Sequence, residues 1–311
     1  MSPHLHAGRD GAFQPGVYVD LLRLHWRRPS RRAMADRPSG TRLLELGNAV
    51  IRVREVGTGQ HTILLTPDAP VVLENYSRLI DQLAPHARVI CFEFPGCGFS
   101  FPRFGFQFRF SDYVDVVRAV MDHHGVERAT LAFTCVNALV AMGYARQYPS
   151  RVAGLALAQV ASVDQMQAFT QRIDFSVAGV RVLGTPIIGQ AFMMGARTAI
   201  AHRWFRAALP KGFDTDRVWS DTRKVFDAGG VFCLASLMQG LSAIRPEDVT
   251  SNVAASVVWG TADRTHRPTD KASIRAHLPH ATIDTLSECG HCPDIEAPEA
   301  YSRRLLALCS N

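Results

Sequence analysis

The sequence predicts an α/β fold in which a mostly parallel sheet is covered by helices on both faces and carries an inserted helical cap. Two observations predict this fold. Short apolar runs of strand length alternate with helical patterns from residue 41 onward. The alternation stops at residues 163–250, which have helical patterns and few strand signals, and it resumes afterwards. A segment of that length is too long to be a loop.

Each element follows from its own pattern. Ser111 is expected to cap a helix whose apolar residues recur at helical spacing, and Pro149 is expected to end the helix at residues 137–148. A short amphipathic helix is expected at residues 17–27, and a further helix at 73–83. The expected strands are residues 42–46, 50–56, 62–66, 88–92, 129–134, 152–159, 255–259 and 281–286, and a closing helix covers residues 297–308.

These elements divide the chain into four parts: a basic arm (1–40), the first part of the core (41–162), the cap (163–250) and the second part of the core (251–311). The arm holds seven Arg and three Asp, which is four of the six net positive charges. It is interpreted either as a solubilising or flexible segment or as a contact for a carrier protein or anionic surface. No nucleic-acid motif accompanies it.

Composition and cysteine content indicate the cellular compartment of the protein. The chain of 311 residues has a mean hydropathy of 0.00 and no apolar run of 18 residues, so no membrane helix is expected. The N-terminus lacks the apolar core of a secretory signal. Seven scattered cysteines fit reduced thiols in a cytoplasm better than a disulfide framework. The oligomeric state is left open.

The motif with the most chemical content lies at residues 131–138 (LAFTCVNA), where a strand gives way to a helix. Many hydrolases have G-x-S-x-G at such a turn, which exposes a nucleophilic serine. Here Cys135 takes the nucleophile position, and Phe133 and Asn137 replace the glycines. A thiolate is a strong nucleophile, whereas an isolated buried cysteine is usually a small apolar side chain.

Three elements in order resemble the α/β-hydrolase superfamily, most closely its capped single-domain members. They are residues 92–100 (FEFPGCGFS), the turn at Cys135, and the C-terminal pair of residues 258–263 (VWGTAD) and 290–299 (GHCPDIEAPE). The resemblance implies a triad of Cys135 as nucleophile, Asp263 as acid and His291 as base. A histidine and a helix N-terminus beside Cys135 are expected to lower the pKa of its thiol. Asp270 and Asp294 are interpreted as surface charges.

The loop after the strand at 62–66 departs from the family pattern, because Pro67 and Asp68 stand where His-Gly is usual. The expected oxyanion donors are the backbone N–H of Val136 and that of Asp68 or Ala69. The Asp68 carboxylate would repel an oxyanion, act as an acid or base, or simply be solvated. Phe133 would project into the pocket or be accommodated by small neighbours such as Ala161.

Apolar cap residues are candidates for lining an acyl tunnel, although helical spacing also fits a plain cap core: Phe192, Met193, Met194, Trp204 and Phe205. The C-x-x-C at Cys289 and Cys292 lacks a second ligand pair at zinc spacing, so no metal site is expected. No nucleotide, flavin or nicotinamide motif is present, so no cofactor is expected.

The predicted function is acyl transfer, to water or to another acceptor, through a Cys135 thioester. The substrate would be an ester, thioester or lactone with an apolar acyl part, free or carrier-protein-bound. Two alternatives stay open: a lyase or cyclase that uses His291 and Asp68 without a covalent step, and a non-catalytic binding protein on a degenerate hydrolase fold. Haloalkane dehalogenase or epoxide hydrolase chemistry is not expected, because those relatives carry Asp at the nucleophile position.

Overall fold

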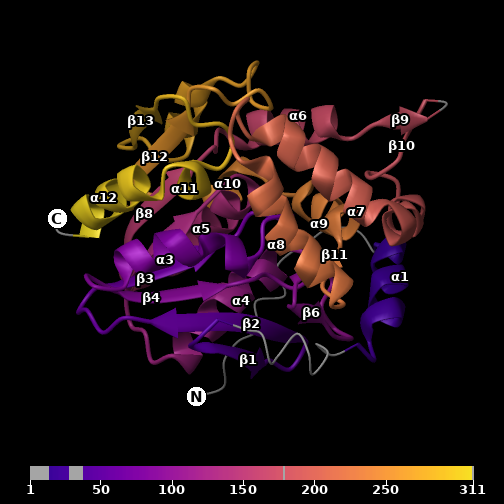
Figure 1. The fold of residues 1–311 in the computed structure, drawn as a ribbon, viewed down its shortest axis with the longest axis horizontal. Coiled ribbons are helices and arrows are strands. Elements are labelled where there is room, and N and C mark those ends of the chain that lie inside the picture. The colour runs from indigo at the N-terminus through magenta and orange to yellow at the C-terminus, as the bar shows by residue number, and fades with distance from the viewer. Residues whose placement is uncertain (1–13, 28–37, 178, 310–311) are drawn as a thin grey trace.

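The computed structural model describes residues 14–27, 38–177 and 179–309. Its centre is a nine-stranded sheet with the order β1-β2-β4-β3-β7-β8-β12-β13 and with β6 beside β2. The strand β2 is antiparallel to β1, β4 and β6, whereas the pairs from β4 onward through β13 are parallel. The predicted mostly parallel sheet is therefore confirmed (Figure 1).

All strands of this sheet except the two-residue β6, which the sequence did not predict, match the predicted strands to within one residue at each end. Their bounds are β1 Thr41–Glu45, β2 Ala49–Val56, β3 Thr62–Thr66, β4 Arg88–Phe92, β6 Phe101–Pro102, β7 Ala129–Phe133, β8 Val152–Ala158, β12 Ala255–Gly260 and β13 Thr282–Leu286. Alternate residues face opposite sides, so Leu64 joins one apolar core while Ile63 and Leu65 join the other. Burial on both faces explains why central strands such as β3 and β4 are mostly apolar.

Helices cover both faces of the sheet. They are η1 Leu73–Tyr76 with α3 Ser77–Leu83, α4 Phe110–His123, α5 Val136–Gln147, η2 Pro149–Arg151, η3 Lys271–Ala276, α11 Pro293–Glu296 and α12 Pro298–Cys309. The α3 and α12 helices pack together on one face, and α4 and α5 pack together on the other. The helix expected from a Ser111 cap begins two residues earlier, because Arg109 is its N-cap and Asp112 accepts the Arg109 N–H at 3.0 Å.

The segment between β8 and β12 forms the helices that lie over one side of the sheet in Figure 1. They are α6 Val163–Ile173, α7 Ile188–Ala208, α8 Thr215–Asp227, α9 Leu234–Leu241 and α10 Pro246–Val249. Short strands that the sequence did not predict complete it: β9 Ser176–Val177 pairs with β10 Val180–Arg181, and β11 Val231–Phe232 pairs with β5 Cys97–Gly98. The β11–β5 pair joins this segment to the loop after β4.

The helix α1 Pro15–Leu24 lies near the expected helix at 17–27 and packs on α7 and α9. Its Asp20 is buried and accepts a hydrogen bond of 2.8 Å from Ser236 on α9. The rest of the basic arm, residues 1–13 and 28–37, lies outside the described residues.

Candidate active site

The turn at Cys135 has the strained geometry that exposes a nucleophile. Cys135 has φ 54° and ψ −128°, in a region that residues other than glycine rarely adopt, and it is the N-cap of α5. Its backbone N–H donates to Ala158 O at 2.8 Å, which ties the turn to β8. Such strain persists only where the surroundings fix it.

The two residues that replace the usual glycines are accommodated in different ways. Phe133 is fully buried beneath the turn, and its ring meets Phe92 and Phe94 edge-on with centroids 5.9 and 6.0 Å apart. It does not line the pocket, so its assignment as a substrate-binding residue is wrong. Asn137 donates a 3.1 Å hydrogen bond to Pro67 O and thereby fastens the loop that carries Asp68.

His291 and Asp263 meet beneath Cys135. His291 Nδ1 lies 3.1 Å from Asp263 Oδ2, and His291 is completely buried. Thr265, which the sequence analysis overlooked, donates through its N–H and hydroxyl to Asp263 Oδ1, both at 2.7 Å, and its hydroxyl lies 3.1 Å from His291 Nδ1. The structure therefore brings together the three residues predicted as a triad and adds a threonine that orients the acid.

The loops that hold these residues are fixed by buried polar groups. Gln159 donates to Gly290 O at 2.6 Å, and His291 N–H donates to Ala208 O at 3.0 Å. Glu296, the glutamate of the G-H-x-P-x-x-E run, accepts the backbone N–H groups of Gly290 and Cys292. That run had only a family resemblance to support it, and the structure shows that its glutamate closes the turn around His291.

Asp68 lies inside the site rather than in solvent. Its side chain is buried, and Oδ2 is 3.6 Å from His291 Nε2, an ion-pair distance longer than a hydrogen bond. His291 Nε2 has no hydrogen-bond partner among the described residues. The interpretation of Asp68 as a solvated loop residue is therefore wrong, and two carboxylates flank one imidazole.

The charges around Cys135 do not favour a free thiolate. Burial, followed by the negative charge of Asp68, raises the pKa of the Cys135 thiol to about 12, against the smaller opposing effect of His291. Burial alone would lower the pKa of His291, but Cys135 and Asp263 raise it well above its usual range. The expected depressed pKa of Cys135 is wrong for this site without substrate, because burial and Asp68 outweigh His291 and the helix N-terminus.

A pocket of about 570 Å³ opens above the cysteine. Cys135, Val136, Asp68, Ala69 and Trp204 line it, as predicted, and its remaining wall is mostly apolar. The volume is within the usual range for small-molecule sites. The Val136 N–H, the first of α5, has no intrahelical partner and interacts with the Cys135 sulfur.

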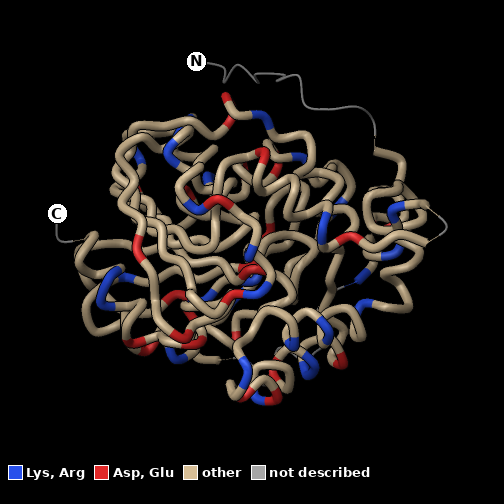
Figure 2. The backbone as a smooth tube through the Cα atoms, turned by 90° about the horizontal axis from the view of Figure 1, so that it is seen from above, with Lys and Arg blue, Asp and Glu red and all other residues tan. Residues whose placement is uncertain are grey.

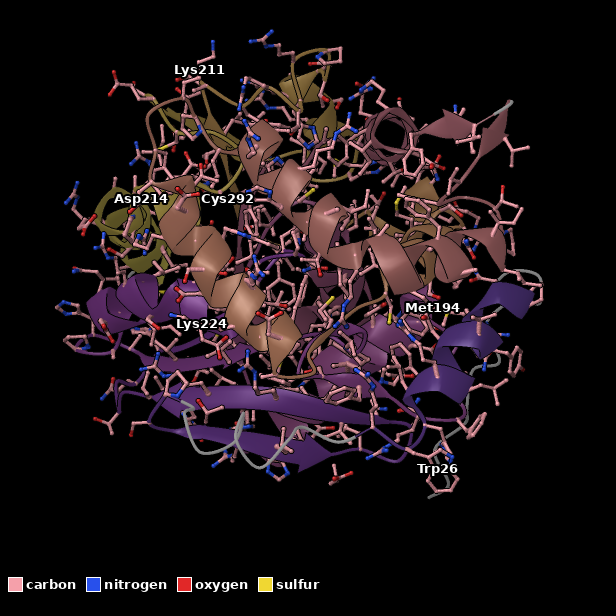
Figure 3. The ribbon with its side chains drawn as sticks, turned by 45° about the vertical axis from the view of Figure 1, so that its right-hand side comes forward. Trp26, Met194, Lys211, Asp214, Lys224 and Cys292 are labelled. Carbon is pink, nitrogen blue, oxygen red and sulfur yellow. The ribbon has the colours of Figure 1, made fainter. Side chains whose placement is uncertain are left out.

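Most of the predicted tunnel residues lie elsewhere. Met193 and Phe205 are buried in the apolar cores, and the Phe192 ring packs on Phe175 with centroids 5.0 Å apart. Met194 is 52% exposed and is labelled near α1 in Figure 3. At about 100° per residue, Met194 points away from Ile200, Arg203 and Ala207, the other residues of α7 that line the pocket. Of the five cap residues proposed, Trp204 lines the pocket, and its ring meets that of His291 with centroids 5.1 Å apart.

Other polar residues near the site differ from expectation. Asp294 is not a surface charge: it is buried, accepts from the Tyr76 hydroxyl, and accepts from Thr134 Oγ1 at 3.1 Å. Asp270 is exposed and caps η3 by accepting the Ala272 N–H at 2.9 Å. Glu93, in the P-G-x-G loop, is buried against Arg52 and accepts the Phe99 N–H at 2.8 Å. These carboxylates support the loops and do not line the pocket.

One group of side chains has the composition of a metal site. Cys135, His266 and His291 each offer a ligand atom within 4.8 Å of the others. Zinc bonds of about 2.0–2.3 Å in tetrahedral geometry require ligand atoms about 3.3–3.8 Å apart. The rings of His266 and His291 are also nearly parallel, 10° apart with centroids separated by 5.2 Å, so their in-plane lone pairs do not converge on one point. The residues as placed do not form a closed metal site.

His266 instead stacks between aromatic rings. Its ring lies 3.9 Å from that of Phe169, and burial, with the charge of His291, lowers its pKa to about 3. It is neutral at physiological pH and forms an apolar wall for His291. No pattern in the sequence distinguished this histidine from the other eleven.

Comparison with known proteins agrees with this architecture. Residues 63–181 match the family model described as the alpha/beta hydrolase fold. A cis-3-alkyl-4-alkyloxetan-2-one decarboxylase of Shewanella oneidensis is 21% identical over 240 residues, which are 70% of this chain and 71% of that protein.

Solved structures of similar fold include a candidate epoxide hydrolase of Pseudomonas aeruginosa, with a TM-score of 0.68 and 15% identity over 87% of this chain and 95% of that one. A haloalkane dehalogenase loop variant of Bradyrhizobium elkanii has a TM-score of 0.67 and 17% identity, over 87% and 96%. A candidate hydrolase of Nostoc sp. PCC 7120 has a TM-score of 0.72 and 17% identity, over 86% and 97%. None of the helices in the described ranges is long and apolar enough to cross a membrane. The sheet order and these comparisons together show that the chain has the α/β-hydrolase fold.

Proposed function

We propose that the protein transfers an apolar acyl group through a thioester on Cys135. The observation that carries this proposal is the placement of a strained Cys135 at the base of a largely apolar pocket, directly above an imidazole held by Asp263. A buried cysteine that served only packing would need neither the strained backbone nor the ordered imidazole.

The reaction would begin with a neutral thiol. His291 acts in its neutral form, which its raised pKa makes the minor form. In that form it takes the Cys135 proton as the sulfur attacks the acyl carbon, and Asp263 stabilises the imidazolium that forms. The N–H groups of Val136 and Ala69 are the proposed oxyanion donors. His291 then protonates the leaving group, which leaves an acyl thioester on Cys135. An acceptor that gives its proton to His291 attacks the thioester and releases the thiol.

Asp68 would act in both halves of this cycle. Its charge opposes formation of a free thiolate, so proton transfer must accompany attack rather than precede it. The same charge lies 3.6 Å from His291 Nε2 and stabilises the imidazolium after each proton transfer. Asp68 also lines the pocket, where it can orient the N–H or O–H of an acceptor.

A second candidate is proton-transfer chemistry without a covalent step, with His291 and Asp68 as the acid and base. Two observations favour it. The Cys135 thiol is not predisposed to ionise, and one relative is a decarboxylase of four-membered lactones by name. In that case the substrate would be a strained lactone with alkyl substituents, which the apolar pocket also fits.

Replacement of the thiol separates the two candidates. With acyl esters, acyl thioesters and an alkyl β-lactone as substrates, Cys135→Ala should abolish turnover if the thioester forms. His291→Ala should abolish turnover under either candidate. Cys135→Ser should be nearly inactive, because Asp68 and burial disfavour ionisation of a hydroxyl even more strongly than that of a thiol. Full activity of Cys135→Ala would refute acyl transfer and support the non-covalent reaction.

A further inference from the structure

The pocket has two walls of different chemistry. One is apolar and comes from α9, β11 and the end of the β9–β10 hairpin, with Leu183, Phe232, Leu237, Met238 and Leu241. The other carries three guanidinium groups from separate elements: Arg172 at the end of α6, Arg203 on α7 and Arg264 after β12. Figure 2 shows that Lys, Arg, Asp and Glu are spread along the backbone as a whole.

No carboxylate neutralises these three arginines within the described ranges. Arg172 donates to the Thr269 hydroxyl at 3.1 Å, and Arg264 donates to the carbonyl oxygens of Arg206 and Leu209 at 2.6 and 2.8 Å. Neutral acceptors of this kind orient a guanidinium and leave its charge intact. Arg264 Nε is moreover buried without a hydrogen-bond partner in the described chain.

Asp68 and Asp174 also line the pocket, and neither forms an ion pair with these arginines in the described chain. Asp174 lines the same pocket, but its two oxygens accept the backbone N–H groups of Leu183 and Gly184, each at 2.8 Å. By contrast, Arg88 and Arg151 away from the pocket pair with carboxylates at 2.6 Å. An uncompensated group of three arginines on a pocket wall fits an anionic part of a ligand.

Two of the arginines come from segments that also carry residues of the site. Arg264 directly follows Asp263, and Arg203 directly precedes Trp204, whose ring lies 5.1 Å from that of His291. A ligand at Cys135 can therefore extend along either wall. The apolar wall suits its acyl chain, and the arginines suit an anion on the group attached to the carbonyl.

We infer that the substrate is an acyl thioester whose thiol part carries phosphate, of the phosphopantetheine type. The acyl chain would lie on the apolar wall, and Arg172, Arg203 and Arg264 would bind the phosphate. Guanidinium groups match phosphate oxygens in geometry and charge. This inference rests on the proposed acyl transfer and names its substrate class. Coenzyme A and a carrier protein both present this phosphate arm.

The test compares one acyl group on three thiols: coenzyme A, a phosphopantetheinylated carrier protein and neutral N-acetylcysteamine. The readout is kcat/KM for acylation of Cys135. The wild type should prefer the phosphate-bearing donors by at least about tenfold. The double variant Arg172→Gln/Arg203→Gln should lose about 10- to 100-fold with those donors, from the loss of charge-assisted hydrogen bonds. Its rate with the neutral donor should be unchanged.

Arg206→Gln is the matched control, because it removes an exposed arginine of α7 that does not line the pocket. It should behave as the wild type. Higher salt should lower kcat/KM for the phosphate-bearing donors only. If the double variant loses kcat/KM equally with the coenzyme A donor and the carrier-protein donor, the phosphate arm itself is the ligand. If it loses kcat/KM with the carrier-protein donor alone, the ligand is the carrier-bound arm. Both outcomes support the inference.

Equal wild-type rates with all three donors, or equal losses in the double variant, would overturn the inference and leave the proposed acyl transfer intact. Absence of Cys135 acylation by any donor would instead overturn the proposed function together with it. The two failures are therefore distinguishable.

Discussion

Removal of the Asp68 charge should make Cys135 more acidic. Asp68→Asn keeps the size of the side chain but abolishes the carboxylate that, after burial, raises the pKa of the thiol. Two unit charges about 4–5 Å apart at an effective dielectric constant of about 20 repel by about 3–4 kcal/mol. Since 1.36 kcal/mol corresponds to one pH unit, the upper limit of the effect is about two to three pH units.

His291 reduces this effect, because it also loses the partner 3.6 Å from its Nε2 and stabilises a thiolate less well. We therefore expect the pKa of Cys135 to fall from about 12 by about one to two pH units. The assay is the pH dependence of alkylation by iodoacetamide, followed for the Cys135 peptide by mass spectrometry. The buried Cys97 and Cys292 serve as internal standards.

Asp263→Asn is the matched control. It removes a carboxylate from the other nitrogen of the same imidazole, at 3.1 Å, and should not lower the pKa of Cys135, because a weaker imidazolium stabilises a thiolate less. An unchanged or higher pKa in Asp68→Asn, or an equal fall in both variants, would refute the assignment of Asp68 as the group that suppresses the thiolate.

Three further predictions concern the triad, the pocket and stability. Asp263→Asn should lower turnover by about 10³- to 10⁴-fold while the circular dichroism spectrum stays native, because the imidazole loses its orienting partner; a loss below tenfold would contradict this role. Leu237→Trp, which fills the apolar wall, should raise KM for long acyl chains and spare short ones, whereas Met194→Trp, outside the pocket, should change neither. Burial lowers the pKa of His124 to about 4, below its ordinary 6.5. Because the pKa of His124 is lower in the folded state than in the unfolded state, stability is lost as pH falls from about 6.5 to 4, by at most about 3 kcal/mol. The free energy of unfolding of His124→Gln, measured in urea, should therefore depend less on pH in this range than that of the wild type. An unchanged pH dependence would contradict this prediction.

The positions of the central strands were predictable because both faces of the sheet are buried there. Residues 62–66 and 129–134 are mostly apolar for that reason, with threonine as their polar residue type. The two-residue strands were not predictable. The pair of Val231 and Phe232 with Cys97 and Gly98 exists only because the segment after β8 folds back over the loop after β4.

The site was partly predictable for a similar reason. Cys135, Asp263 and His291 each follow a strand, and parallel strands bring their carboxyl ends to one edge. The environment of each residue could not be predicted. The burial of Asp68 follows from the hydrogen bond between Asn137 and Pro67, which are 70 residues apart. The raised pKa of Cys135 depends on that burial. The expectation of a thiolate was wrong because contacts between residues far apart in the sequence set this pKa.

Which cap residues line the pocket also depends on tertiary packing. Helical spacing places Met194 only about 80° from Trp204 around α7, and it does not say which face of the helix meets the site. The contact between Trp204 and His291 decides this, and it also brings Arg203 to the pocket.

The central claim is that a covalent acyl group resides on Cys135 during turnover. Intact-mass spectrometry of the protein, quenched in acid within the first turnover of an acyl thioester, tests this claim most directly. The account predicts a gain of one acyl group in the wild type, its location on the Cys135 peptide, and its absence in Cys135→Ala. Substrate consumption by the wild type with no adduct at any time, together with full activity of Cys135→Ala, would contradict it.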